Sequence, residues 1–191
     1  MLTTTVQAGR QGEQGFSLLE VMIAAVVLSF GLMGLVAMQA TAKFSSYESR
    51  QRTIASWLAN DLVERVRINQ DSWSTQSITL VSGNSNLTLP SCASADGTMA
   101  ACSRSDLRNL DLFYWQQSLL GAAVSGASSS LQAPVGCVIR GANNSLTVGI
   151  FWRGKASLSD GAAAVAGVRD ACGVGNVADN QRRQFVLTTT L

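Results

Sequence analysis

The sequence predicts an α+β protein in which a long N-terminal α-helix packs on a small antiparallel β-sheet. Residues 21–38 carry no charge and no proline occurs before Pro90, so one helix can run from about residue 16 to residue 69. After residue 70 the sequence changes to short apolar segments separated by stretches rich in Gly, Ser and Asn. Such segments are typical of strands joined by turns, and a helix followed by a run of strands is the α+β order.

Residues 16–38 are long and apolar enough to span a membrane. Residues 21–38 form an uncharged run of 18, close to the roughly 20 predominantly apolar residues that a spanning helix needs. The polar residues 1–15 precede this stretch and no small-residue cleavage site follows it, unlike a secretory signal peptide. We therefore expect a retained, single-pass anchor. Glu20 lies at the edge of this anchor, where a carboxylate is costly and so needs a partner or a role.

Residues 39–70 are expected to continue the helix as an amphipathic segment. Five apolar positions of this segment lie mostly four apart, which places them on one face of a helix. They are Tyr47, Ile54, Leu58, Leu62 and Val66. The charged side chains lie largely off this stripe, so we expect it to rest on a globular domain formed by residues 71–191.

Strands are expected in four parts of this domain. Residues 77–90 are typical of two short strands around the turn at Gly83 and Asn84, and further strands are expected at 135–141, 145–154 and 182–191. In the strand at 145–154, the apolar side chains alternate onto one face of the sheet. These side chains are Leu146, Val148, Ile150 and Trp152.

A short helix is expected within residues 103–122, with Ser105 as its N-cap and Gly121 as its stop. Its apolar stripe would consist of Leu107, Leu110, Tyr114 and Leu120. Residues 126–136 and 158–180 are expected to be loops, because small and polar residues dominate both. Trp57, Trp73 and Trp115 are interpreted as anchors of the core or of an interface.

The four cysteines, Cys92, Cys102, Cys137 and Cys172, all follow the apolar stretch. Their even number on one side of a membrane anchor indicates two disulfides in an oxidising compartment, and three connectivities are possible. We favour Cys92–Cys102 and Cys137–Cys172, because neighbours in sequence close the shorter loops. The alternative is four free thiols in a cytosolic domain.

An enzyme, a cofactor or a metal site is not expected. The chain has no histidine, which removes the commonest general base and the commonest metal ligand. The aspartates of the domain show no telling spacing, and no glycine cluster suggests a phosphate site. These aspartates are Asp96, Asp106, Asp111, Asp160, Asp170 and Asp179.

A net charge of +2 gives no general electrostatic reason to bind nucleic acid. A local patch is a separate possibility, since Arg182 and Arg183 together with Arg140, Arg153 and Trp152 could bind DNA. The interpretation we prefer is a strand edge that its charges protect from pairing.

The orientation of the anchor is predicted differently by two features. Arg10 precedes the span, whereas Lys43, Arg50 and Arg52 follow it, and this bias would place the C-terminal domain in the cytoplasm. The cysteines favour the oxidising side of the membrane instead.

The start of the apolar helix resembles the type IV prepilin signature. The shared features are the polar leader at residues 1–15, then Gly15, Phe16 and, four residues later, Glu20. The resemblance implies that a prepilin peptidase cuts between Gly15 and Phe16 and methylates the new terminus at Phe16. It also implies a helix anchored in the bacterial inner membrane, a pilin-like domain in the periplasm and no enzymatic activity.

Glu20 becomes the fifth residue of the mature chain under this resemblance. The new amine at Phe16 lies one helical turn away, so it can pair with Glu20 within one chain. Between stacked subunits, the amine of one chain could meet the carboxylate of the next and fix their register. Glu20 is therefore our predicted assembly contact.

Later segments resemble the minor pilins, which implies a subunit that joins other minor pilins and the major pilin, primes assembly and can sit at the pilus tip. They are residues 59–70, residues 111–120, the strand with Trp152 and residues 182–187. A minor pseudopilin of type II secretion is the nearest alternative. A pilus-associated module that binds DNA or surfaces is an alternative of another class.

Overall fold

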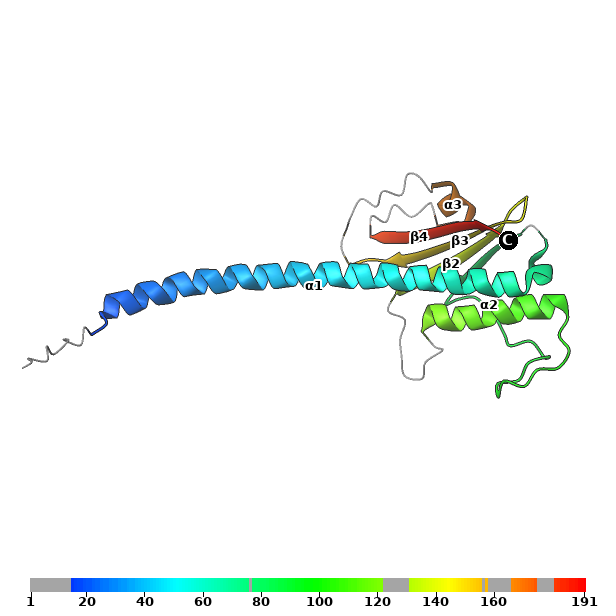
Figure 1. Ribbon diagram of the computed structural model, residues 1–191, viewed down its shortest axis with the longest axis horizontal. Coiled ribbons are helices and arrows are strands. Elements are labelled where there is room, and N and C mark those ends of the chain that lie inside the picture. The colour runs from blue at the N-terminus through cyan, green and yellow to red at the C-terminus, as the bar shows by residue number, and fades with distance from the viewer. Residues whose placement is uncertain (1–14, 76, 122–130, 156, 158–165, 175–180) are drawn as a thin grey trace, which may run out of the picture. The chain divides into compact units, whose positions relative to one another are not determined.

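The computed structural model describes residues 15–75, 77–121, 131–155, 157, 166–174 and 181–191. Its helices are α1 (Leu18–Ile68), the 3₁₀-helix η1 (Gln70–Trp73), α2 (Arg104–Leu120) and α3 (Ala166–Ala171). Its strands are β1 (Ser77–Ser82), β2 (Gln132–Arg140), β3 (Ser145–Arg153) and β4 (Arg182–Thr190) (Figure 1). The predicted α+β class, with a long N-terminal helix and a small antiparallel sheet, is confirmed.

Internal contacts divide the chain into two units, Met1–Ser46 and Tyr47–Leu191. In the first unit, the structure describes the first part of α1 and the residues just before it. Every residue from Gly15 to Lys43 is exposed. This part of α1 holds a stretch long and apolar enough to cross a membrane, and none of that stretch is buried.

The second unit is built on one antiparallel sheet with the strand order β1-β2-β3-β4. Asn143 and Asn144 both have positive φ in the turn that joins β2 to β3, and the Ser145 N–H donates to the Ala142 carbonyl across it. Two consecutive positive φ values match the right-handed twist of a hairpin. Asn tolerates this conformation better than most residues, which explains the local sequence.

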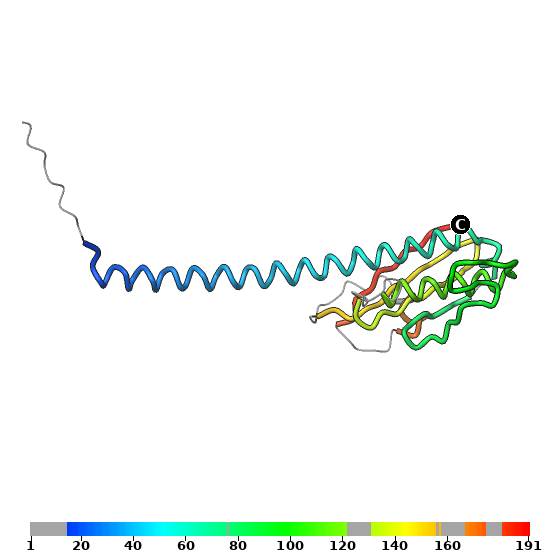
Figure 2. The backbone as a smooth tube through the Cα atoms, turned by 90° about the horizontal axis from the view of Figure 1, so that it is seen from below, coloured from blue at the N-terminus to red at the C-terminus, as the bar shows by residue number. Residues whose placement is uncertain are grey.

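One face of the sheet is covered by α2 and by the part of α1 after Ser46. Leu146, Val148, Ile150 and Trp152 of β3 are all fully buried on this face, which confirms their predicted alternation. The indole N–H of Trp115 in α2 donates to the Leu58 carbonyl of α1 at 2.9 Å. The two helices lie side by side in both views, and the C-terminal residue lies near the end of α1 (Figures 1 and 2).

A second, smaller apolar cluster lies on the opposite face of the sheet. It comprises Cys137, Phe151, Cys172 and Val174, with Val168 of α3 packed against it. Side chains alternate between the two faces of a strand, so Cys137 and Phe151 point away from the neighbours that face α1.

Three local predictions were wrong. Residues 83–90 form no strand, because β1 pairs with β2 rather than with the segment that follows it. The N-cap of α2 is Ser103 rather than Ser105. The expected loop at 158–180 contains α3, and the expected loop at 126–136 includes the start of β2. Residues 126–130, 158–165 and 175–180 of these loops lie outside the described residues.

The predicted stripe of α2 was also partly wrong. Leu110 is buried, but Tyr114 is exposed, and the helix buries Leu112, Trp115 and Leu119 instead. Gly121 ends the helix with a left-handed φ of 76°, as predicted.

Candidate functional site

The site that the sequence predicts lies at the start of α1. Gly15 and Phe16 precede the helix, and the Phe16 side chain is exposed. Glu20 lies in the first helical turn. The three residues therefore lie together at one exposed helix start, and the predicted cleavage bond between Gly15 and Phe16 lies outside regular secondary structure.

Ser17 caps this helix and was missed by the sequence analysis. Its Oγ accepts a hydrogen bond from the Leu19 N–H at 3.3 Å, and its carbonyl accepts one from the Glu20 N–H at 3.0 Å. A Ser followed three residues later by Glu is the sequence pattern of a capping box, so the signal was present. A carboxylate in the first turn also interacts favourably with the positive end of the helix dipole.

The second group of functional interest lies at the start of the second unit, where α1 meets the sheet. Glu48 Oε2 lies 3.3 Å from Nε of Arg183 in β4, with side-chain exposures of 12% and 1%. One turn later, Gln51 Oε1 accepts a hydrogen bond from the Trp152 indole at 3.1 Å, and its Nε2 donates to the Tyr47 hydroxyl at 3.0 Å. These contacts fix the helix on β3 and β4 through polar groups rather than through apolar packing alone.

Sequence reasoning missed the roles of Glu48 and Gln51. A signal existed for Gln51, because it lies four residues after Tyr47 and seven before Leu58, on the predicted apolar stripe. A polar side chain on such a stripe must find a hydrogen-bond partner when it is buried.

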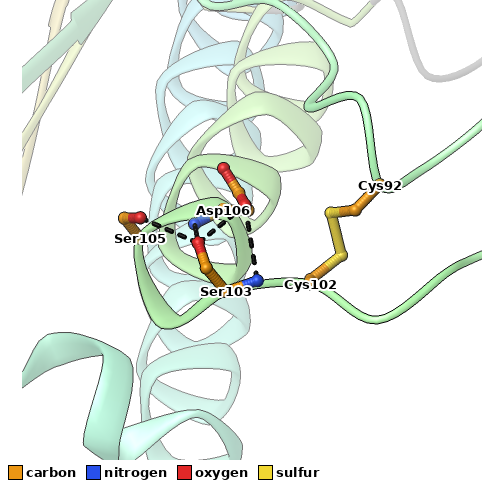
Figure 3. The surroundings of a disulfide bond; sticks show 5 residues. All are labelled: Cys92, Cys102, Ser103, Ser105 and Asp106. Atoms are coloured by element: carbon orange, nitrogen blue, oxygen red, sulfur yellow. Dashed lines mark hydrogen bonds between the residues drawn. A yellow bond between two sulfur atoms is a disulfide. The ribbon is translucent and has the colours of Figure 1, made fainter.

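One disulfide lies beside the start of α2. Cys92 and Cys102 are joined, and the Ala93–Met99 bridge pairs backbone inside the loop that they close. Ser103 follows directly as the N-cap, its Oγ accepting from the Asp106 N–H while Asp106 Oδ2 accepts from the Ser103 N–H (Figure 3). The disulfide and the capping box together determine where α2 begins.

The other disulfide joins Cys137 of β2 to Cys172, just after α3. Both pairings are those favoured from the sequence, and no described cysteine is free. This bond holds the α3 segment on the second face of the sheet, where Val168 and Val174 add apolar contacts.

Asp111 is a buried carboxylate between α2 and η1. Its Oδ2 accepts hydrogen bonds from Asn69 Nδ2 at 2.9 Å and from the Trp73 indole at 3.3 Å. Burial raises the pKa of Asp111, and the two hydrogen bonds oppose that rise. The neighbouring Arg108 lies over the Trp73 ring, 4.8 Å from its centroid. These contacts connect the end of α1 to α2, and none of them indicates a catalytic or ligand-binding role.

The basic, aromatic patch that the sequence left as a possibility is not present on the surface. Trp152, Arg140 and Arg183 are buried. Arg140 donates to the Trp73 carbonyl at 2.9 Å and to the Ser145 carbonyl at 3.1 Å, so it connects the β2–β3 turn to η1. Only Arg153 is exposed, and Arg182 is half-buried. The patch does not form because buried backbone carbonyls accept hydrogen bonds from Arg140 and Glu48 accepts one from Arg183, so both guanidinium groups point inward.

No group of three or more potential metal ligands occurs among the described residues, and Asp160 and Asp179 lie outside them. Trp73 and Trp115 are core residues as predicted, whereas Trp57 is 74% exposed and belongs to no core.

Two parts of the chain match known families. Residues 10–36 match the prokaryotic N-terminal methylation motif, which includes Gly15, Phe16 and Glu20. Residues 37–113 match the Tt1218-like family, described as type IV pilin Tt1218, from residue 37 within α1 to residue 113 within α2. No curated protein and no solved structure matches the chain.

The matched family is structural rather than enzymatic. The methylation motif implies processing by a prepilin peptidase and assembly with other pilins, and with the apolar helix it fits membrane anchoring before assembly. Over residues 10–113, this chain therefore carries the N-terminal methylation motif and the Tt1218-like segment of a type IV pilin.

Proposed function

We propose that this chain is a minor pilin of a type IV pilus, most like the minor pilin PilV. A prepilin peptidase cuts between Gly15 and Phe16 and methylates Phe16. The helix α1 then holds the chain in inner-membrane lipid, with the C-terminal domain in the periplasm. From there the chain joins other minor pilins and the major pilin in a complex that primes pilus assembly and can sit at the tip.

The observation that carries this proposal is the exposed first part of α1. Its apolar side chains from Leu18 to Met38 are not packed against any other described part of the chain, and one carboxylate, Glu20, lies among them. An apolar helix surface of this extent is stable only in lipid or against other subunits. A subunit that moves from the membrane into a filament meets both environments in turn.

Glu20 has a physical role in this transfer. After cleavage, the amine of Phe16 lies at the positive end of the helix dipole, which disfavours a second positive charge there. A carboxylate one turn away offsets that charge within the chain. Against a neighbouring subunit in an apolar filament core, the amine and the carboxylate of different chains can pair and fix the stagger.

The periplasmic orientation is supported by the two disulfides, because such bonds persist in oxidising compartments. This argument outweighs the charge bias around the span. The choice of a pilus over type II secretion is supported by the segments at residues 59–70, 111–120 and 182–187, which resemble minor pilins. A minor pseudopilin shares the leader and the helix and is the second candidate.

The test is incorporation of the full chain into sheared pili. Glu20→Ala should be processed after Gly15 yet recovered in pili at no more than about a tenth of the parent level, because a cost of 1.4 kcal/mol is tenfold. Ser29→Ala, on the same exposed helix, is the matched control and should be incorporated normally. Equal incorporation of the two variants would refute the role of Glu20.

Copurification with pilus subunits or with secretion pseudopilins separates the two candidate systems. The parent chain, solubilised from membranes that contain both systems, should retain minor pilins after washing. Retention of secretion pseudopilins alone would replace the proposed function by its alternative.

A further inference from the structure

The sheet has two edges, which differ in chemistry. The β4 edge begins with the half-buried Arg182, and a charge of this kind commonly protects an edge from pairing with other chains. The β1 edge, Ser77–Ser82, contains no charge and no proline. Among the described residues, β1 pairs only with β2. The outer side of β1 is therefore the edge with the least protection.

The hydrogen bonds at Ser82 show which backbone groups of β1 point outward. The Ser82 N–H donates to Ser85 Oγ at 3.0 Å, and the Ser82 carbonyl accepts from Gln116 Nε2 at 2.7 Å. Both Ser82 groups thus face away from β2. In an antiparallel pair the direction alternates along the strand, so the N–H and C=O groups of Leu80 and Ile78 face outward as well. The structure describes no hydrogen bond to these four groups.

The side chains of the same two residues are apolar and open to solvent. Ile78 is 55% exposed and Leu80 is 48% exposed. The intervening hydroxyls of Ser77 and Thr79 accept hydrogen bonds from Arg108 of α2, so Ile78 and Leu80 point to the face opposite α2. An incoming strand would therefore find main-chain partners at the edge and aliphatic contacts beside it.

We propose that the outer edge of β1, from Ser77 to Val81, receives an extended strand from another pilus subunit. This inference rests on the proposed function for the identity of the partner. The edge selects an uncharged segment with aliphatic side chains at alternate positions, which is the chemistry of strand addition. The carbonyl and N–H of Ser82 are already hydrogen-bonded to Gln116 and Ser85, so the added strand covers only about five residues.

A photo-crosslinking side chain at position 78 of the full chain, in cells that assemble pili, tests this edge. The same side chain at position 190, an exposed position on β4, is the matched control. We expect an adduct from position 78 to an extended segment of another subunit with an N-terminal methylation motif. Position 190 should give no adduct of this kind.

Two substitutions at Leu80 test the mechanism of pairing. Leu80→Pro removes an outward N–H and spares the bonds to β2, and proline is tolerated at such edge positions. Leu80→Lys keeps the N–H and adds a protecting charge. Leu80→Pro should reduce the adduct about tenfold or more, because the edge loses a main-chain hydrogen bond and the leucine contact. Leu80→Lys should also reduce it about tenfold or more, because the edge loses the apolar contact and gains a charge that disfavours pairing. If the Leu80→Pro chain fails to form both disulfides, it has not folded, and the test of pairing then rests on Leu80→Lys alone.

An adduct that survives in a folded Leu80 variant would overturn the inference. So would the absence of an adduct, or adducts only to lipid or to a second copy of this chain. With processing after Gly15 and normal incorporation into pili, such a result refutes the edge inference alone. A chain that is neither processed nor incorporated refutes the proposed function instead.

Discussion

The two parts of α1 use apolar residues in opposite ways. From Leu18 to Met38 the apolar side chains are exposed, whereas from Ala55 to Val66 the apolar stripe is buried in the core of the second unit. Both parts are helical, so helix formation does not distinguish them. The difference shows which residues stabilise the fold and which are available to lipid or to other subunits.

The largest expected effect compares one leucine from each part. Leu62→Ala should lower the free energy of unfolding by about 2–5 kcal/mol, because it removes buried contacts and leaves a cavity. Leu28→Ala should leave it unchanged, because Leu28 is 64% exposed. Urea unfolding of the full chain in detergent, followed by tryptophan fluorescence, measures both. Equal losses would mean that the first part of α1 contributes to the folded core.

A second substitution marks where the helix begins to contribute to the fold. Glu48→Ala removes the carboxylate beside the buried Arg183 guanidinium and should cost about 3 kcal/mol, as expected for breaking a buried ion pair. Arg50→Ala, at an exposed position two residues later, should change stability by less than about 0.5 kcal/mol. The same unfolding assay compares them, and equal values would contradict the anchoring role of Glu48.

A steric test concerns the packing of α2 on the sheet. A Cβ at Gly136 would lie 2.2 Å from the Trp115 ring, whereas a Cβ at Gly83 would lie 3.7 Å from Leu120. Gly136→Ala should therefore cost about 1–3 kcal/mol, the usual range for overpacking. Gly83→Ala is the control and should unfold like the parent. A neutral Gly136→Ala would show that the Trp115 ring does not lie on β2.

The smallest expected effect is a pH dependence that arises at Asp111. Because burial raises the pKa of Asp111, the folded chain binds more protons than the unfolded chain above the ordinary value of 3.8. The contribution to stability is full below that value and is lost as the pH rises through the pKa of the folded state. In Asp111→Asn this decline should be absent, because an amide does not titrate. Its oxygen can still accept hydrogen bonds from Asn69 and Trp73, so the packing is kept. A parent that gains stability relative to Asp111→Asn as the pH rises would contradict the sign.

Secondary structure was predicted well from the sequence where one hydrophobic pattern continued without a second pattern that favoured another element. Nothing interrupts the helix before Ile68, and the alternation in β3 fits only one side of a sheet. The capping pattern of Ser103 and Asp106 was present but overlooked in favour of Ser105. The first site residues could also be placed, because Gly15, Phe16 and Glu20 lie close together in the sequence.

Other features depend on partners that are distant in the sequence. The segment after β1 forms no strand, because the side-chain amide of Gln116 in α2 donates hydrogen bonds to the carbonyls of Ser82 and Ser85. Arg140 and Arg183 looked like surface charges, yet acceptors in η1 and α1 hold both inside the domain. No local pattern encodes such contacts.

The most direct measurement is the mass and N-terminal sequence of the protein from membranes that contain a prepilin peptidase. The account predicts a chain that starts at methylated Phe16, with the mass of residues 16–191, one methyl group and two disulfides. A chain that still starts at Met1, while the peptidase processes a control substrate, would contradict it. The exposed part of α1 would then be a membrane anchor with no route into a filament.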